Sequence, residues 1–404
     1  MMQKKFLILI IVMAQAAYAS AQLKYRNVAD FDNDWKFYWA DTVDAKDDYK
    51  NSSYDDASWR TLNLPHDWSI EGSFSQKNPA TPEGGALPGG IGWYRKTFSV
   101  PAASKGKSVF IDFDGVYRNS EVWINDHYLG KRPNGYISFR YELTPWLNYG
   151  GKNVISVKVD NSKQPNSRWY SGSGIYRNVW LVTTAPVSVA QWGTYITTPK
   201  VLAQLAAVQI ATTVRKEKGA PVTITLRTVI TDAGGHEVAR SISKPVVLKD
   251  SLTEIPQGLS VERPVPWSVD HPYLYKASIE VLRNGTPVDD YVLSFGIRSF
   301  DFDVRKGFIL NGSPLKILGV CDHHDLGCLG AAINTRALER QLEILKRMGC
   351  NAIRTSHNPP APELLDLCDR MGFIVMDEAF DMWKRRKTKF DYSLDWDNWH
   401  RTDL

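Results

Sequence analysis

The sequence predicts a multidomain protein in which β-sandwiches are followed by an α/β structure. Its 404 residues are too many for one ordinary hydrophobic core, so two or three domains are expected. Short β-rich runs separated by Gly and Pro extend to about residue 298, and strands alternate with helices after Phe300. The composition, 43% hydrophobic and 23% charged, is typical of soluble globular domains. A net charge of +5 without a basic, aromatic-rich stripe argues against nucleic acid as a partner.

Residues 1–21 have the pattern of a cleaved export signal. Lys4 and Lys5 precede a short apolar run, residues 6–13, and small residues follow at Ala17, Ala19 and Ala21. The run is too short to span a bilayer, and no other stretch of the chain is long enough. The mature protein is therefore expected to be exported, to the periplasm or outside the cell.

Residues 22–185 read as a jelly-roll β-sandwich. Residues 109–113, 121–124 and 127–130 are short β-rich runs, with a turn at Asn125–Asp126. Residues 153–159 alternate apolar and polar side chains, as in a half-buried strand.

Residues 186–298 read as an immunoglobulin-like β-sandwich. The β-rich runs 222–226 and 277–281 and a turn at 232–235 lie within a segment of suitable length. The segment has no Cys and only two Trp, Trp192 and Trp267, so the core found in antibody domains is absent.

Residues 299–404 read as the first three βα units of an incomplete (β/α)8 barrel. A hairpin at Asn311–Gly312 precedes alternating strands and helices. They are a buried strand at 315–320, a helix at 335–348 with Met348 on its apolar face, a strand at 352–354, a helix at 362–371 and a strand at 373–376. A complete barrel takes roughly 250 residues, and about 100 follow Phe300. The expectation is a truncated barrel with an unpaired, aggregation-prone strand edge.

All four cysteines lie in this last segment, at Cys321, Cys328, Cys350 and Cys368. Export permits disulfides. The first 320 residues contain no cysteine, however, and Cys350 and Cys368 fall in or beside predicted core helices. We expect free thiols, and no spacing matches a zinc site.

Ordered motifs along the chain resemble one enzyme family. Residues 319–325 (GVCDHHD), 351–359 (NAIRTSHNP) and 375–379 (VMDEA) look like the start of the catalytic barrel of glycoside hydrolase family 2, the β-galactosidase and β-glucuronidase family. Upstream, residues 122–125 (VWIN) and 173–179 (SGIYRNV) resemble its sugar-binding jelly roll. The stretch from Trp267 to Tyr275 resembles the end of its immunoglobulin-like domain.

The resemblance implies retaining hydrolysis of a terminal β-linked sugar by two glutamates about 5–5.5 Å apart. In the family, the first glutamate belongs to an Asn-Glu pair, and this sequence has none. The acid/base and the nucleophile are therefore expected beyond Leu404, and residues 1–404 are expected not to turn over substrate. The function expected from the resemblance is that of an exo-β-galactosidase with a glycan substrate. A β-glucuronidase and a non-catalytic carbohydrate-binding protein remain alternatives, and the oligomeric state, including a homo-oligomer, stays open.

The resemblance also suggests substrate-binding residues. His323 and His357 follow the first two barrel strands and would line the substrate subsite, or be loop histidines exposed to water. His324 should point away from His323. Asn358 is either a sugar contact or a turn residue. The stretch Arg168–Trp169 is expected near the mouth of the site.

Asp377 is a further candidate for contact with the substrate, and Arg354 and Glu378 are interpreted as a network around the site. Asp377 is either sugar-facing or structural, and Glu378, its neighbour on the strand, should point to the other side. Arg354 needs a carboxylate partner, which in the family would be a later glutamate, so it is expected to be stranded here.

No metal or other cofactor is expected. Many β-galactosidases of the family bind magnesium through a further Glu and His, and Met382 and Lys384 stand at those places. Neither suits a hard cation. The cationic run 384–389 is interpreted as a solvated loop.

Overall fold

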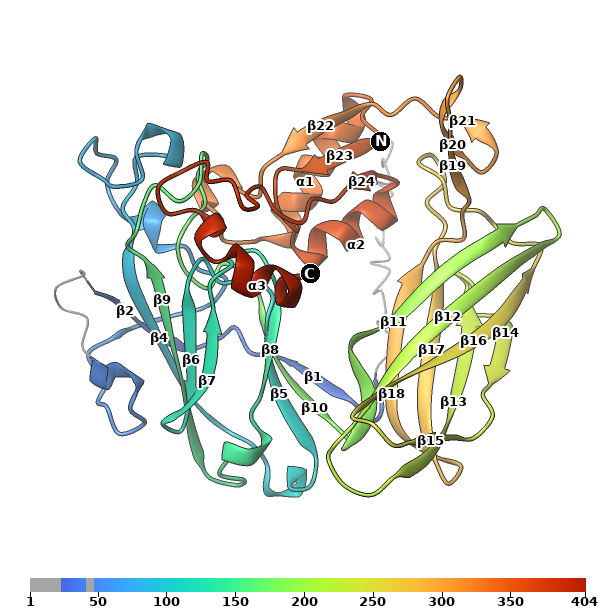
Figure 1. Cartoon of the computed structure of the whole chain (residues 1–404), viewed down its shortest axis with the longest axis horizontal. Helices are drawn as coiled ribbons and strands as arrows, with labels where there is room; N and C mark the ends of the chain where they lie inside the picture. The colour runs from blue at the N-terminus through green and yellow to red at the C-terminus, as the bar shows by residue number, and fades with distance from the viewer. Residues whose placement is uncertain (1–22, 41–46) are drawn as a thin grey trace, which may run out of the picture.

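The protein was analysed as a computed structural model that describes residues 23–40 and 47–404. Two β-sandwiches stand side by side, and a small α/β unit lies above the space between them (Figure 1). Each has its own cluster of buried apolar side chains, so three hydrophobic cores stabilise the chain. The predicted export signal lies outside the described residues. No helix in the described part of the chain is long and apolar enough to cross a membrane.

The first sandwich is built from two antiparallel sheets. Its four-stranded sheet has the order β1 (Asn27–Asp30), β10 (Val179–Thr184), β5 (Ser108–Phe113) and β8 (Phe139–Glu142). Its six-stranded sheet has the order β3 (Arg60–Leu62), β2 (Trp35–Ala40), β4 (Gly90–Ser99), β9 (Lys152–Asn161), β6 (Ser120–Ile124) and β7 (His127–Arg132). The predicted turn at Asn125–Asp126 is confirmed, since both residues have positive φ, as the connection from β6 to β7 requires.

The second sandwich has a three-stranded and a five-stranded sheet. The first has the order β11 (Val187–Val201), β12 (Leu205–Lys216) and β16 (Leu252–Glu262). The second has the order β14 (Glu237–Ile242), β13 (Val222–Thr231), β17 (Tyr275–Arg283) and β18 (Thr286–Phe295), and β15 (Val246–Leu248) also pairs with β13. The alternating burial along β12, β13, β16 and β17 reflects one face on the core and one in water.

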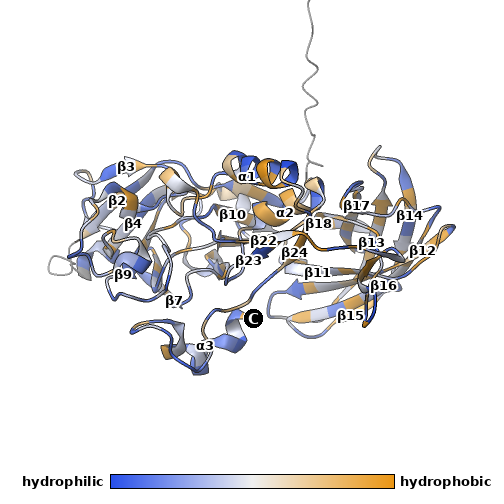
Figure 2. Cartoon of the chain, turned by 90° about the horizontal axis from the view of Figure 1, so that it is seen from above, coloured by the Kyte–Doolittle hydropathy of each residue, from blue (hydrophilic) through white to orange (hydrophobic). Residues whose placement is uncertain are grey.

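The C-terminal unit is a parallel three-stranded sheet with two helices on one side of it (Figure 2). A hairpin of β19 (Phe300–Asp303), β20 (Gly307–Leu310) and β21 (Ser313–Pro314) leads into it. Its elements in chain order are β22 (Gly319–Asp322), α1 (Thr335–Arg347), β23 (Ala352–Thr355), α2 (Pro362–Met371), β24 (Ile374–Met376) and α3 (Trp396–Asp403). Within the described residues the sheet does not close into a barrel, which confirms the predicted incomplete barrel.

Short 3₁₀ helices connect several strands. They are η1 (Asp47–Lys50), η2 (Trp68–Glu71), η3 (Pro82–Gly84), η4 (Ala102–Ser104), η5 (Thr144–Trp146), η6 (Gly327–Leu329) and η7 (Tyr392–Leu394). The predicted bounds of α2 are confirmed, because Pro362 occupies its first turn and Gly372 ends it in the left-handed conformation.

Two predictions for this unit were wrong. The strand predicted at 315–320 begins only at Gly319, and Ile317 and Leu318 are about half exposed rather than buried. The amide of Leu318 bonds the side-chain oxygen of Asn351 instead of a neighbouring strand, so the apolar run lies outside the ladder. Met348 is 68% exposed because it caps α1 instead of continuing its buried face. The expectation of free thiols is confirmed for all four cysteines.

Candidate functional site

The candidate site lies where the three parallel strands end. His323 follows β22, His357 follows β23 and Glu378 follows β24. Because carboxyl ends of parallel strands meet at one rim, side chains far apart in sequence come together there. A loop of the first sandwich, which carries Trp169, reaches the same rim.

Trp169 packs against both histidines. Its ring centroid lies 5.3 Å from that of His323 and 5.0 Å from that of His357, and the two imidazoles are 5.4 Å apart. The indole Nε1 donates to the hydroxyl of Tyr136 at 3.1 Å, which holds the ring in place. The structure thus brings together three residues that the sequence suggested for substrate binding.

Glu378 and Arg354 form a bidentate ion pair at this rim. The Nε and Nη2 atoms of Arg354 lie 2.7 and 3.0 Å from the two carboxylate oxygens of Glu378. The expectation that Arg354 is stranded was therefore wrong. Its partner is the glutamate that follows the next strand, because β23 and β24 run parallel and Arg354 pairs with Met376. Asp377 does not share this pair, and its Oδ1 is 3.3 Å from the hydroxyl of Thr355.

The same pair orients His357. Nη2 of Arg354 lies 2.9 Å from Nδ1 of His357. A guanidinium only donates, so Nδ1 accepts in this contact, which is shorter than the 3.3 Å between Nδ1 and Oε2 of Glu378. On the shorter contact, a neutral His357 carries its proton on Nε2. The imidazole is left with one N–H that can donate to a bound group.

The other two histidine environments favour neutral rings. Burial lowers the pKa of His323, and the neighbouring His357 lowers it further. The ring of His324 packs against Tyr136 and Tyr176, and its Nε2 lies 3.2 Å from the carbonyl oxygen of Ser171. Burial lowers the pKa of His324 to about 3. At neutral pH these imidazoles serve as hydrogen-bonding groups rather than as charges.

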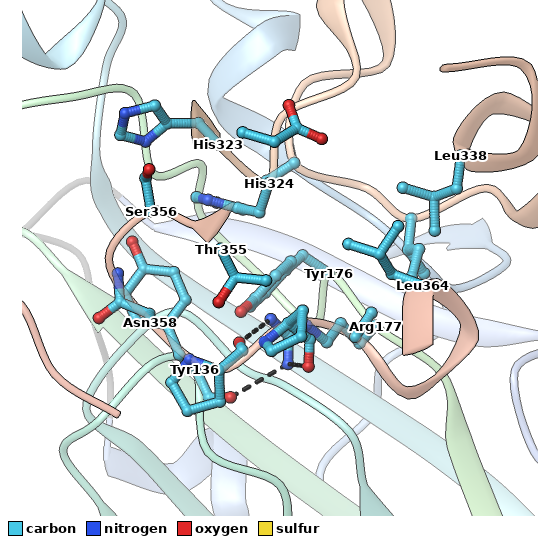
Figure 3. Close-up of a pocket in the computed structure, with 16 residues that line it drawn as sticks. Tyr136, Tyr176, Arg177, His323, His324, Leu338, Thr355, Ser356, Asn358 and Leu364 are labelled. Atoms are coloured by element: carbon cyan, nitrogen blue, oxygen red, sulfur yellow. Dashed lines mark hydrogen bonds between the residues drawn. The ribbon is translucent and has the colours of Figure 1, made fainter. Parts of the chain in front are cut away.

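A cavity of about 30 Å³ lies beneath the rim, lined by Tyr136, His323, His324 and Asn358 among others (Figure 3). This volume has room for about two water molecules, so a sugar ring would have to bind above it. Within the described part of the chain, Nδ1 of His323 and Nδ2 of Asn358 are buried without a hydrogen-bond partner. Both atoms are available to a water or a ligand.

Arg177 is a site residue that the sequence reasoning did not single out. It is 1% exposed and donates to the backbone oxygens of Tyr136, Pro359 and Pro360 (Figure 3). It thereby ties the loop after β23 to the first sandwich. Its place inside the motif 173–179 was the only signal for it in the sequence.

Arg168 does not point at the histidines. Its Nη2 bonds both oxygens of the buried Asp381 at 2.9 and 3.1 Å, and Lys387 bonds the same carboxylate at 2.8 Å. The interpretation of residues 384–389 as a solvated loop holds for the exposed Lys384, while Lys387 is anchored.

The residues at the family's magnesium positions do not fit that ion. Met382 is buried, and Lys384 is exposed near Asp397, and neither side chain provides an oxygen ligand. No group of three or more His, Cys, Asp or Glu within the described ranges is arranged to hold a metal ion.

Comparisons with known proteins agree with this architecture. Three models of one family match in order: the sugar binding domain of glycosyl hydrolases family 2 at residues 28–185, the family 2 model at 192–298, and its TIM barrel domain at 302–398.

Individual relatives match nearly the whole chain. The β-galactosidase BoGH2A of Bacteroides ovatus is 54% identical over 96% of this chain and 45% of its own length. A β-glucuronidase of Formosa agariphila is 30% identical over 87% of this chain and 38% of its own. The crystal structure of a family 2 member from Bacteroides cellulosilyticus superposes with a TM-score of 0.90 at 40% identity, covering 93% of this chain and 49% of that one.

The chain thus spans about half the length of the relatives it matches. Three family models in their own order, two sandwiches and a partial barrel lead to one conclusion: this chain belongs to glycosyl hydrolase family 2.

Proposed function

We propose that these residues form the substrate rim of a retaining exo-β-galactosidase, which removes terminal non-reducing β-linked galactose. The observation that carries this proposal is the convergence of Trp169, His323 and His357 at the ends of the parallel strands. An indole offers an apolar face to a sugar ring, and neutral imidazoles can bond its hydroxyls. The Nε2–H of His357, set by Arg354, would donate to one of them.

Within this proposal Glu378 is a positioning residue. Retaining hydrolysis needs two carboxyl groups about 5–5.5 Å apart, one as acid/base and one as nucleophile. Glu378 is engaged by both donors of Arg354, and its neighbour Asp377 bonds Thr355 instead. We therefore propose that residues 1–404 alone bind sugar without turning it over.

Galactose is preferred over glucuronate as the sugar. Carboxylates already hold Arg168 and Arg354, and Arg177 donates to backbone oxygens. None of the three is then free to bind a sugar carboxylate. The 54% identical relative is named a β-galactosidase, whereas two proteins of Formosa agariphila named putative β-glucuronidase and β-glucuronidase are 39% and 30% identical. β-Glucuronidase activity is the second candidate.

Hydrolysis of 4-nitrophenyl β-galactoside and β-glucuronide tests these proposals. We expect no turnover by residues 1–404, and galactoside hydrolysis with retained configuration by any longer chain that the DNA beyond codon 404 encodes. Turnover by residues 1–404 would contradict the assignment of the carboxylates. Preference of the extended chain for the glucuronide would favour the second candidate, and inactivity on both would favour a non-catalytic carbohydrate-binding protein.

We also propose that residues 1–21 are removed during export. The basic start and short apolar run support this. N-terminal sequencing of the protein from a periplasmic or culture fraction should begin near residue 22, and an intact Met1 in that fraction would contradict cleavage.

A further inference from the structure

A second concave site lies away from the barrel rim. It is a groove of about 490 Å³ between the outer face of the four-stranded sheet, the second sandwich and the N-terminal ends of α1 and α2. Figure 1 shows these elements around the space below α2, with β1 and β10 on one side and β11 and β18 on the other. None of the candidate-site residues lines it. The volume is within the range of about 300–1,000 Å³ typical of small-molecule sites.

The floor of the groove is a row of side chains across three strands. Trp180 on β10 pairs with Asp112 on β5, which pairs with Arg140 on β8. Cross-strand neighbours project from the same face of a sheet, so an indole, a carboxylate and a guanidinium stand side by side. The guanidinium is fixed by two 2.6 Å bonds to Asp112, and the indole by a 2.7 Å bond to Asp114. This floor combines a fixed aromatic surface with fixed hydrogen-bonding groups.

Trp192 stands at the edge of the groove in an unusual backbone conformation. The ladder between β11 and β12 is interrupted between Val189 and Thr194, and within that interruption Trp192 has φ of 48°. A left-handed backbone is rare for a bulky residue, and bulges often redirect a side chain next to a binding site. The redirected indole is 61% exposed. A large apolar ring kept in water by a strained backbone is a feature of binding surfaces.

The charges of the groove select the class of ligand. Its two arginines are already paired, Arg26 with Asp289 and Arg140 with Asp112. The first turns of α2 add the carboxylates of Glu363 and Asp366. Asn178 donates to Oε1 of Glu363, and within the described residues its buried Oε2 has no hydrogen-bond partner. An anionic ligand would meet these carboxylates without a free cation, while hydroxyl groups could donate to them.

We propose that this groove binds a neutral oligosaccharide, with sugar rings against Trp180 and Trp192 and hydroxyls bonded to the carboxylates of α2. It would hold a second part of the glycan at a distance from the rim. Binding in the groove does not require hydrolysis at the barrel rim, so an experiment can contradict either proposal without contradicting the other.

Calorimetric titration of the 404-residue chain with β-1,4-galactotetraose, cellotetraose and tetragalacturonate tests this assignment. At least one neutral tetraose should bind, and the Trp192→Ala variant should weaken it about tenfold, the size expected for loss of one aromatic contact. Glu363→Gln should also weaken binding. Trp146→Ala is the matched control, because Trp146 is also partly exposed but stacks on His127 elsewhere in the first sandwich. That variant should bind like the parent chain.

Trp169→Ala separates the groove from the barrel rim, since Trp169 belongs to the rim alone. Tetraose binding that survives this change and is weakened about tenfold in Trp192→Ala supports the groove. Loss in Trp169→Ala with full binding by Trp192→Ala would overturn the assignment. It would also be overturned if neither neutral tetraose binds, or if tetragalacturonate binds as tightly as the neutral sugars. Unchanged circular dichroism of each variant establishes that it is folded.

Discussion

Asp67 connects the first sandwich to both loops of the candidate site, and its removal should destabilise the chain strongly. Asp67 is 2% exposed, and its carboxylate accepts four hydrogen bonds. Oδ1 accepts from the amides of Ser69 and Ser173 at 3.0 and 2.8 Å. Oδ2 accepts from the amide of Ala331 at 2.9 Å and from the hydroxyl of Tyr170. These bonds join the loop that carries Trp169 and the loop that follows His323.

The magnitude follows from the groups left without a partner. Asp67→Ala leaves three buried amides and one hydroxyl without a partner, at about 1–3 kcal/mol each. The free energy of unfolding should therefore fall by at least about 4 kcal/mol. Asp67→Asn keeps one carbonyl oxygen for the two amides, and the hydroxyl of Tyr170 can turn to accept from the new amide. Only the N–H of Ala331 then faces another N–H and loses its acceptor. This predicts that the free energy of unfolding falls by about 1–3 kcal/mol. Burial raises the pKa of Asp67, so removing its charge offsets part of this loss.

Urea unfolding and amide hydrogen exchange measure this effect. Three cores need not unfold together, so exchange at Ala331 and Ser173 reports the local change directly. In Asp67→Ala both amides should lose protection by at least about tenfold, or 1.4 kcal/mol. Asp250→Asn, at an exposed aspartate, is the control and should change neither quantity. The reasoning is refuted if Asp67→Ala matches that control, or if Asp67→Asn is the more damaging change.

Three further predictions concern tautomers, pH and thiols. In Arg354→Met, nitrogen NMR should show a larger share of the Nδ1–H tautomer of His357, because Nδ1 loses its donor and keeps the carboxylate of Glu378 as an acceptor 3.3 Å away; an unchanged spectrum would contradict the assignment. Burial raises the pKa of Asp114 to about 7, so the folded state binds more protons than the unfolded state between about pH 4 and 7, and the contribution of Asp114 to the free energy of unfolding falls as pH rises through that window. Asp114→Asn should therefore be increasingly stabilising relative to the parent chain from pH 4 to pH 7.5, and a constant difference in urea midpoint would count against it. Ellman's reagent should label the exposed Cys328 in the native protein and Cys368 only after unfolding, since burial raises the pKa of Cys368 to about 12; rapid native labelling of Cys368 would show that α2 is not packed as described.

Much of the fold could be predicted from the sequence because it depends on local patterns. The strand at residues 153–159 and the positive-φ turn at Asn125–Asp126 are written in adjacent residues. The expectation that this strand is half-buried was wrong, because residues 153–157 of β9 are buried on both faces. The bounds of α2 follow from Pro362 and Gly372, which start and end a helix whatever surrounds it. Where pattern alone was used to judge burial, as at Ile317 and Met348, the prediction failed, since burial depends on what packs against the segment.

The site could be predicted only in part. The positions of His323, His357 and Glu378 at neighbouring strand ends follow from the order of strands and helices along the chain. The partner of Arg354 did not follow, because the register of β23 against β24 sets it. Asp67 gave no signal: its bond to Ala331 joins residues 264 positions apart.

The sequence by itself therefore determined the three domains, their order, most of their strands and helices, and the family. The tertiary structure decided which side chains meet: Trp169 between two histidines, Arg354 on Glu378, and Trp180 and Trp192 around one groove. The physical reason is that local backbone preferences and hydrophobic periodicity act over a few residues. Contacts between separate cores arise only when those cores pack against one another, and no short stretch of sequence encodes that arrangement.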